Sequence, residues 1–216
     1  MPEIIPISDP EDPRIAGYRD VRERDVVGRA GMFVAEGEVV LNALLGGRSR
    51  HGVDSLLIAD KRLATLAPLL ARVPGGVPVY GASQAVMDAI VGFPIHRGIL
   101  ALGRQAPNPG LDETLAGLGE RATVVVLSEI ANHDNLGGIF RNAAAFGVDA
   151  VLLDSGCCDP LYRKAIRVSV GAALVVPTVK CGTTLEILEA LAAHGFEMLG
   201  LSPRGAAVLA DYARPR

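Results

Sequence analysis

Short apolar runs alternate with amphipathic segments along most of the chain. Apolar runs bounded by turn residues indicate buried strands, and apolar residues repeating every three or four positions indicate helices. The expected strands are 55–59, 77–80, 98–102, 123–127, 150–154, 174–177 and 196–201. The expected helices include 39–45, 62–73 and 84–91, the last of them capped by Ser83. This alternation predicts an α/β fold.

Residues 123–154 follow the pattern of a βαβ unit. The first strand enters a polar turn that ends in Asn135-Leu-Gly-Gly138, and a short helix is expected to follow at once. Ile139, Ala143 and Phe146 are spaced at i, i+4 and i+7, so we expect them to face the sheet. A βαβ unit usually places its polar turn at a ligand site.

Arg141 is expected close to the N-terminus of that helix. A cation there opposes the helix dipole, at a cost of a few tenths to about 1 kcal/mol. That cost favours an anionic partner, such as a phosphate held by the guanidinium and backbone N–H groups together. The alternative is an ordinary turn followed by a solvated arginine.

A second cluster of cations lies on the helix expected after Pro160. Arg163, Lys164 and Arg167 fall within one turn, so at least two of them share a face. Such a cluster suits a polyanion, but a solvated basic helix explains it equally well.

The composition limits what the chain can be. Its 216 residues fit one large domain or two small ones, and a net charge of −3 argues against coating nucleic acid through bulk charge. A local basic patch remains compatible with binding a folded RNA. Cys157, Cys158 and Cys181 lack metal-ligand spacing, so we expect no metal and interpret them as reduced thiols of a cytoplasmic protein. No apolar run or leader pattern indicates membrane insertion or secretion.

Several spaced motifs occur in a fixed order in the second half of the chain. They are Asn135-x-Gly137-x-x-x-Arg141, Phe146-Gly147, Asp159-Pro160 and Arg167-x-Ser169-x-Gly171-Ala172. This succession resembles the SpoU branch of the SPOUT superfamily of RNA methyltransferases. The resemblance implies an α/β-knot domain built on a parallel sheet.

The same resemblance implies a reaction, namely methyl transfer from S-adenosylmethionine to a ribose 2′-hydroxyl of ribosomal or transfer RNA. It implies catalytic roles for Arg141 and Asn135 and RNA contacts for Arg163, Lys164, Arg167 and Ser169. A guanidinium stays protonated at physiological pH, so Arg141 is no general base. We expect it to bind the phosphate or ribose oxygen and stabilise charge on the attacking oxygen.

The first half of the chain is similar to the ribosomal-protein-like RNA-binding domain that precedes many SpoU domains, with Glu36 and Arg97 at matching positions. We expect residues 1–30 to form an N-terminal arm, 31–104 this domain, 105–121 a linker and 122–216 the methyltransferase domain. The arm carries five arginines and is either RNA-facing or a solvated helix; they are Arg14, Arg19, Arg22, Arg24 and Arg29. We interpret His96 as a turn histidine.

The family pattern continues beyond the point where this sequence ends. The resemblance therefore implies a C-terminally incomplete domain, in which Leu201 and Ser202 are the remaining cofactor-contacting positions. We expect weak S-adenosylmethionine binding or none. The alternative function is a non-catalytic RNA-binding or assembly protein. The resemblance also implies a homodimer. The absent segment contributes to the dimer contact in the family, so a monomer is the alternative. An unrelated nucleotide-binding protein is disfavoured, because no Gly-x-Gly-x-x-Gly or Walker sequence occurs.

Overall fold

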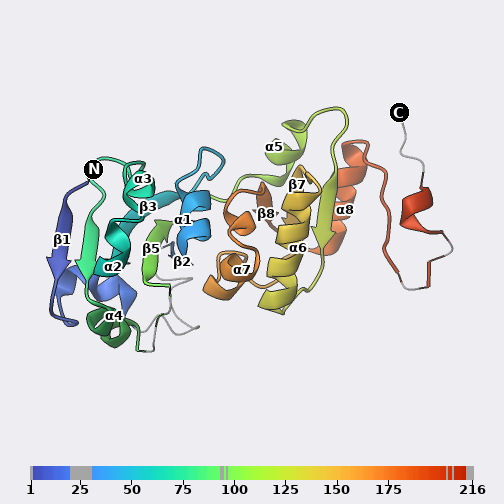
Figure 1. Cartoon of the computed structure of the whole chain (residues 1–216). Helices are drawn as coiled ribbons and strands as arrows, with labels where there is room; N and C mark the ends of the chain where they lie inside the picture. Colours follow the sequence, from blue (N-terminus) through green and yellow to red (C-terminus); the bar gives the residue numbers. More distant parts are fainter. Residues whose placement is uncertain are drawn as a thin grey trace.

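Two β-sheets lie side by side along the length of the molecule (Figure 1). The computed structural model describes residues 2–19, 31–92, 95, 97–202, 204–205 and 207–212. A five-stranded mixed sheet occupies the first half and a three-stranded parallel sheet the second. The prediction of an α/β fold with a parallel sheet in the second half is therefore confirmed.

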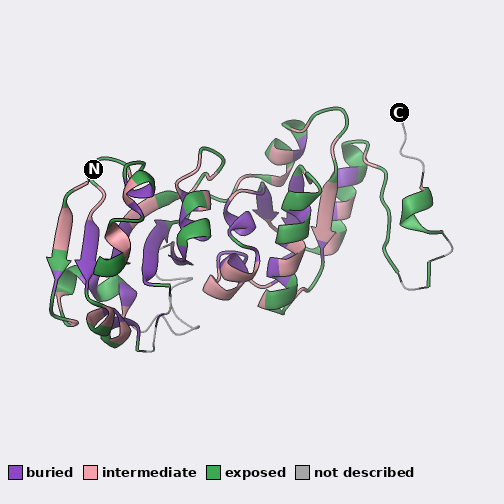
Figure 2. Ribbon diagram, viewed as in Figure 1, coloured by how far each residue is buried: buried purple, intermediate pink, exposed green. Residues whose placement is uncertain are grey.

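The N-terminal sheet has the strand order β1-β4-β3-β5-β2. Its strands are β1 (Ile4–Ile7), β2 (Met32–Glu36), β3 (Gly52–Ala59), β4 (Val79–Ala82) and β5 (Ile99–Arg104). Strands β1, β4 and β3 run parallel, whereas β5 pairs antiparallel with both β3 and β2. Successive residues of β3 enter two different apolar clusters, Leu56 and Ile58 on one face and Leu57 and Ala59 on the other. The sheet is thus buried on both faces, as Figure 2 shows.

Helices cover both faces of this sheet. The elements are η1 (Pro13–Tyr18), α1 (Glu38–Leu44), α2 (Asp60–Leu63), α3 (Ala67–Leu70) and α4 (Gln84–Val91). The expected helix 62–73 is instead interrupted after α2 and resumes at α3, where Pro68 occupies the first turn. Proline is tolerated there because first-turn N–H groups have no partner within the helix. The Ser83 cap is confirmed, since its side chain accepts the N–H of Val86 at 3.3 Å.

Most of the described part of the expected N-terminal arm belongs to the sheet domain. Strand β1 pairs with β4, and η1 buries Ile15 and Tyr18 completely. The phenol of Tyr18 lies 2.9 Å from the Ser55 hydroxyl, which anchors η1 to β3. A free arm is therefore wrong for residues 2–19. The expectations for Arg22, Arg24, Arg29 and His96 fall on residues outside the described ones.

The C-terminal sheet has the order β6-β7-β8 and lies between two helical layers. Its strands are β6 (Val124–Leu127), β7 (Ala150–Leu153) and β8 (Thr178–Lys180). Helices α6 (His133–Ala145) and α7 (Arg163–Val168) and the turn η2 (Ala172–Leu174) cover one face, and α5 (Leu111–Ala116) and α8 (Thr184–Ala193) cover the other. Four expected details differ.

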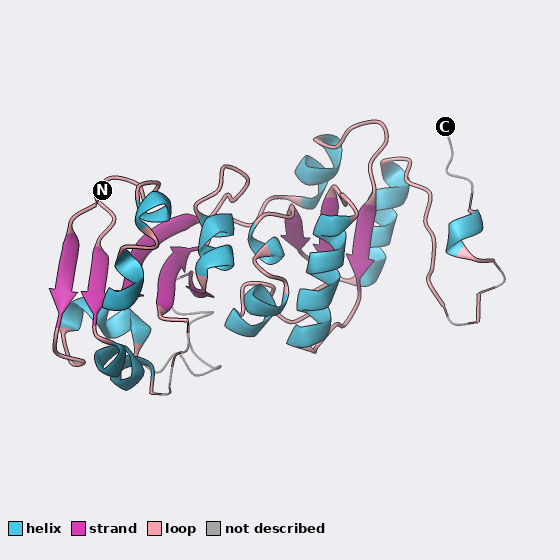
Figure 3. Cartoon of the chain, viewed as in Figure 1, coloured by secondary structure: helices cyan, strands magenta, loops and turns pink. Residues whose placement is uncertain are grey.

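Helix α6 begins earlier than expected, so Asn135, Gly137 and Gly138 lie inside it rather than in a turn. Leu136, Phe140 and Ala143 face the sheet, whereas Phe146 follows the helix and is 85% exposed. The expected strand 174–177 is displaced to β8, because η2 occupies its first residue. The expected strand 196–201 is a loop leading away from the sheet (Figure 3), and its residues pair with no described strand.

One of the four buried apolar clusters of the described residues spans both halves. Leu161, Ile166 and Leu174 of the second half belong to the same buried cluster as Phe33 and Leu41 of the first. The connecting segment is fixed to both sheets rather than loose. The Asn108 side chain donates to the carbonyl of Lys180 at 2.8 Å and accepts its N–H at 3.3 Å, which extends the edge of β8.

Candidate functional site

The first turn of α6 is built from polar residues that satisfy its free N–H groups. The Asn132 side chain caps the helix by accepting the N–H groups of Asp134 and Asn135 at 2.8 and 3.2 Å. Asn135 is exposed, so its amide is accessible at the start of the helix. Glycine is required at position 137, because a Cβ there would lie 2.8 Å from the Ala165 carbonyl oxygen of α7. The motif glycine therefore allows α6 to approach α7 closely.

Arg141 is the ninth residue of the thirteen in α6, not a first-turn residue. The argument from the helix dipole is therefore wrong, since that effect is confined to the terminal turn. The side chain is exposed, and it forms no hydrogen bond or ion pair with the described residues. At about 100° per residue, Arg141 lies within about 20° of Asp134 and about 40° of Gly137 around the helix. It therefore borders the seam between α6 and α7.

The cations of α7 have different surroundings from one another. Arg163 is bonded to Glu36 at the end of β2, with its Nε and Nη2 atoms 3.1 and 2.6 Å from Glu36 Oε2. Both side chains are largely buried, 13% and 9% exposed respectively. Arg167 is half-exposed and lies 4.0 Å from the same carboxylate oxygen. Glu36 and Arg163 thus join the two halves of the chain, which leaves little of either side chain for an RNA.

Two further contacts attach the start of α6 to α7. Lys164 pairs with Asp134 at 2.7 Å, and the rings of His133 and Tyr162 stack with their centroids 4.0 Å apart. Lys164 is half-exposed and remains on the surface of this helix pair.

Ser169 does not fit an RNA-binding role in this structure. It is 1% exposed, donates to the Ile166 carbonyl at 2.9 Å and accepts the Ala173 N–H at 3.2 Å. The expectation of an RNA contact is therefore contradicted by burial, and Ser169 instead shapes the turn that follows α7. Arg97 is exposed in the first half, where it lies against Gly37.

A buried carboxylate that the sequence analysis missed organises the loops at the carboxyl ends of the strands. Asp154, directly after β7, accepts hydrogen bonds from Thr184 and Ser128 hydroxyls at 2.7 and 3.0 Å. It also accepts the N–H groups of Glu129 and Cys157 at 3.1 and 3.0 Å. The bond from Thr184, with the others, holds the pKa of Asp154 well below its usual range. A polar residue at the end of an otherwise apolar strand was the available signal.

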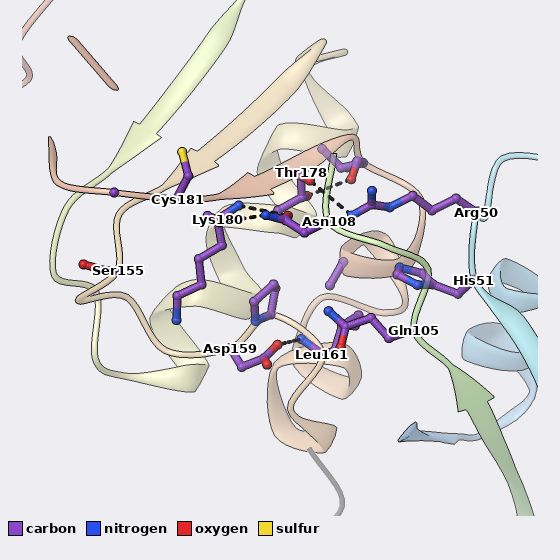
Figure 4. Close-up of a pocket in the computed structure, with 14 residues that line it drawn as sticks. Arg50, His51, Gln105, Asn108, Ser155, Asp159, Leu161, Thr178, Lys180 and Cys181 are labelled. Carbon is purple, nitrogen blue, oxygen red and sulfur yellow. Dashed lines mark hydrogen bonds between the residues drawn. The ribbon is translucent and has the colours of Figure 1, made fainter. Parts of the chain in front are cut away.

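A polar cavity of about 460 Å³ lies between the two halves (Figure 4). Three parts of the chain line it: the residues before β3, the linker and the loops around β7, β8 and α7. Figure 4 labels the side chains Arg50, His51, Gln105, Asn108, Asp159 and Lys180 among those around it. Neither Asn135 nor Arg141 lines it. Sequence analysis missed this site, because its walls are far apart along the chain.

Leu201 and Ser202 lie in the exposed C-terminal segment and line neither described cavity. Leu201 is 78% exposed. The Ser202 hydroxyl accepts only the N–H of Arg204 among the described residues. No enclosed cofactor site is therefore formed at these two positions in the structure.

The arrangement defines an α/β protein in which an exposed arginine lies on α6, the helix between the first two strands of a parallel sheet. The fold is that of known RNA methyltransferases. A crystal structure of an RNA 2′-O ribose methyltransferase is similar over 94% of this chain and 76% of that chain, with 22% identity and a TM-score of 0.69. An AdoMet-bound rRNA methyltransferase from Sinorhizobium meliloti matches 88% of this chain and 69% of its own, with 20% identity and a TM-score of 0.69.

Sequence comparison identifies the family. Residues 122–215 match the SpoU rRNA Methylase family. An uncharacterized tRNA/rRNA methyltransferase of Mycobacterium bovis is 41% identical over 207 residues, which are 94% of this chain and 69% of that protein. The 23S rRNA (guanosine-2′-O-)-methyltransferase RlmB of Acinetobacter baylyi is 29% identical, over 68% of this chain and 65% of its own length. The chain belongs to the SpoU rRNA methylase family. Within its described part, no helix is both long and apolar enough to cross a membrane.

Proposed function

We propose that this protein transfers a methyl group from S-adenosylmethionine to a ribose 2′-hydroxyl of ribosomal or transfer RNA. Membership of the SpoU family and the printed names of its relatives support this reaction. The observation that carries the proposal is Arg141, an exposed guanidinium without an ion-pair partner among the described residues. Its neighbours Arg163 and Lys164 both have carboxylate partners.

Methyl transfer requires alignment of the reacting atoms and stabilisation of charge, and it needs no metal. When bound, S-adenosylmethionine supplies an already activated methyl group on its sulfonium. Arg141 contributes a fixed positive charge that binds the phosphate or ribose oxygen at the target and stabilises the attacking oxygen as it loses its proton. Asn135, in the first turn of the same helix, is proposed to contact the ribose or a second subunit. Leu201 and Ser202 remain the positions proposed to contact the cofactor, supported here by the family pattern rather than by an enclosed cavity.

The proposed RNA surface follows the seam between α6 and α7. Arg141, Lys164 and Arg167 are exposed or half-exposed there. Arg97 extends the surface into the first half, and residues 31–104 form the proposed RNA-binding domain. Glu36, Arg163 and Ser169 support this surface from within, because their polar groups are already bonded to the protein. A homodimer is also proposed, since the exposed Phe146 offers an apolar contact at the end of α6.

Methyl transfer with labelled S-adenosylmethionine on ribosomal and transfer RNA tests the proposal. We expect Arg141→Ala to reduce the rate at least ~100-fold, because one charge-stabilising donor is lost, while the RNA dissociation constant stays within about threefold. Arg121→Ala is the control, since Arg121 is an exposed arginine of the linker, outside residues 31–104 and outside α6 and α7. Wild-type rates for Arg141→Ala would refute its role.

A non-catalytic RNA-binding protein is the second candidate. The absence of an enclosed cavity at Leu201 and Ser202 in the described structure favours it. Wild-type protein that binds RNA but methylates none of the substrates, even at saturating S-adenosylmethionine, would select this alternative.

A further inference from the structure

The cavity between the two halves contains two cations that have no carboxylate partner among the described residues. Arg50 donates to the carbonyl oxygens of Pro107 and Thr178 at 3.0 and 3.2 Å. Lys180 donates to the carbonyl oxygen of Cys157. These bonds fix both side chains in place while most of their N–H donors stay unused by the described residues. Partial desolvation lowers the pKa of Arg50, and an electronegative group in the cavity would counter that effect.

The remaining lining groups suit a ligand that is more than a simple anion, because they offer an aromatic ring, a carboxylate oxygen and apolar side chains. The His51 ring packs edge-on against Phe33 with centroids 5.3 Å apart, and its Nδ1 accepts the Ala106 N–H at 3.2 Å. In the neutral ring Nε2–H is therefore the donor, and no hydrogen bond joins it to the described residues. One oxygen of Asp159 accepts the Leu161 N–H at 2.8 Å, and the other oxygen accepts no bond from the described residues. Leu161 and Val176 add an apolar wall.

We propose that this cavity binds a single nucleotide. Its phosphate lies against Lys180, its base lies between His51 and the apolar wall on the side of Arg50, and Asp159 accepts an amino or hydroxyl group. The volume of about 460 Å³ falls within the usual range for ligands of this size. An unstacked nucleotide of RNA and a free nucleoside monophosphate share this chemistry. The RNA source rests on the proposed function, whereas binding of a free mononucleotide does not.

Calorimetric titration of the whole chain at low salt tests the proposal. The probes are the four nucleoside 5′-monophosphates, hexauridylate and inorganic phosphate. Lys180→Met removes one cation and keeps its aliphatic stem. Ser155→Phe narrows the cavity from an exposed lining position, so it serves if Lys180→Met disturbs folding. Arg121→Gln is the control, because Arg121 is an exposed linker residue that lies outside residues 31–104 and does not line the cavity. Circular dichroism melting verifies that each variant is folded.

We expect Lys180→Met and Ser155→Phe each to weaken nucleotide binding at least about tenfold, since a charge-assisted hydrogen bond or the available space is lost. Arg121→Gln should stay within about twofold. Binding of mononucleotides identifies a free ligand, whereas binding of hexauridylate alone, lost in the same variants, identifies RNA. Any of three results would overturn the proposal: inorganic phosphate binds as tightly as the nucleotides, binding survives both cavity variants, or no binding is seen at millimolar concentration. Binding without methyl transfer would instead count against the proposed function and leave the nucleotide site standing.

Discussion

Stability should be sensitive to the loss of either partner of the buried ion pair between Glu36 and Arg163, because the remaining charge would stay buried at the interface between the two halves. Glu36→Gln keeps the shape of the side chain but removes the negative charge that faces Arg163 and Arg167. Removing one partner from a buried pair costs about 3–5 kcal/mol, and we expect about 3 because glutamine still accepts a hydrogen bond. For a chain of this length, that loss corresponds to a melting temperature lowered by about 6–12 °C.

The matched control lies two residues further along the chain. Glu38 pairs with Arg62 at 2.9 Å, but these side chains are 50% and 35% exposed. An exposed pair contributes about 0–1 kcal/mol, so Glu38→Gln should change the melting temperature by no more than a few degrees. Urea unfolding and calorimetric melting of both variants measure the difference. If Glu36→Gln unfolds at the same temperature as Glu38→Gln, the two halves do not depend on this pair.

Three further predictions concern packing and pH. Gly137→Ala should destabilise the fold by about 1–3 kcal/mol through the clash with α7, whereas Gly138→Ala, with open space around it, should stabilise it by about 0.5–1 kcal/mol in urea unfolding. Asp154→Asn should lower the urea midpoint at pH 7, and the gap from wild type should narrow as the pH falls below about 4, because the stability that the lowered pKa of Asp154 contributes is complete above about pH 4 and is lost progressively below it. Burial lowers the pKa of His51 to about 4, so the folded state resists protonation of this ring and loses stability as the pH falls from about 6.5 to about 4. His51→Gln should therefore flatten that part of the plot of urea midpoint against pH. An unchanged slope would contradict this assignment.

The strands were largely predictable because their signal is local. Apolar runs such as 55–59 and 150–154 fall within or next to β3 and β7. The start of α6 was not predictable in this way, since its first turn is polar and depends on the Asn132 cap and on contacts with α7. Phe146 was misplaced because α6 ends one residue before it, so helical spacing no longer determines which way it faces.

The candidate site was predictable only in part. The motif positions Asn135 and Arg141 were found from their spacing, and both side chains are exposed on α6. The pairing of Glu36 with Arg163 spans 127 residues, and nothing local distinguishes a paired arginine from a free one. The cavity around Arg50 and Lys180 forms only when separate segments meet. Tertiary proximity of this kind has no short-range trace in a single sequence.

The shared cluster of Phe33, Leu41, Leu161, Ile166 and Leu174 has an evolutionary consequence. Modules joined by a loose tether can be exchanged between genes, because each retains its own folded interior. Here the interface between the two halves is itself part of a buried cluster. A first half exchanged from another protein would therefore have to pack against the side chains of α7 and its neighbours. We therefore expect both halves to be inherited together, and grafting either onto a foreign partner to require reshaping the joint as well as reconnecting the chain.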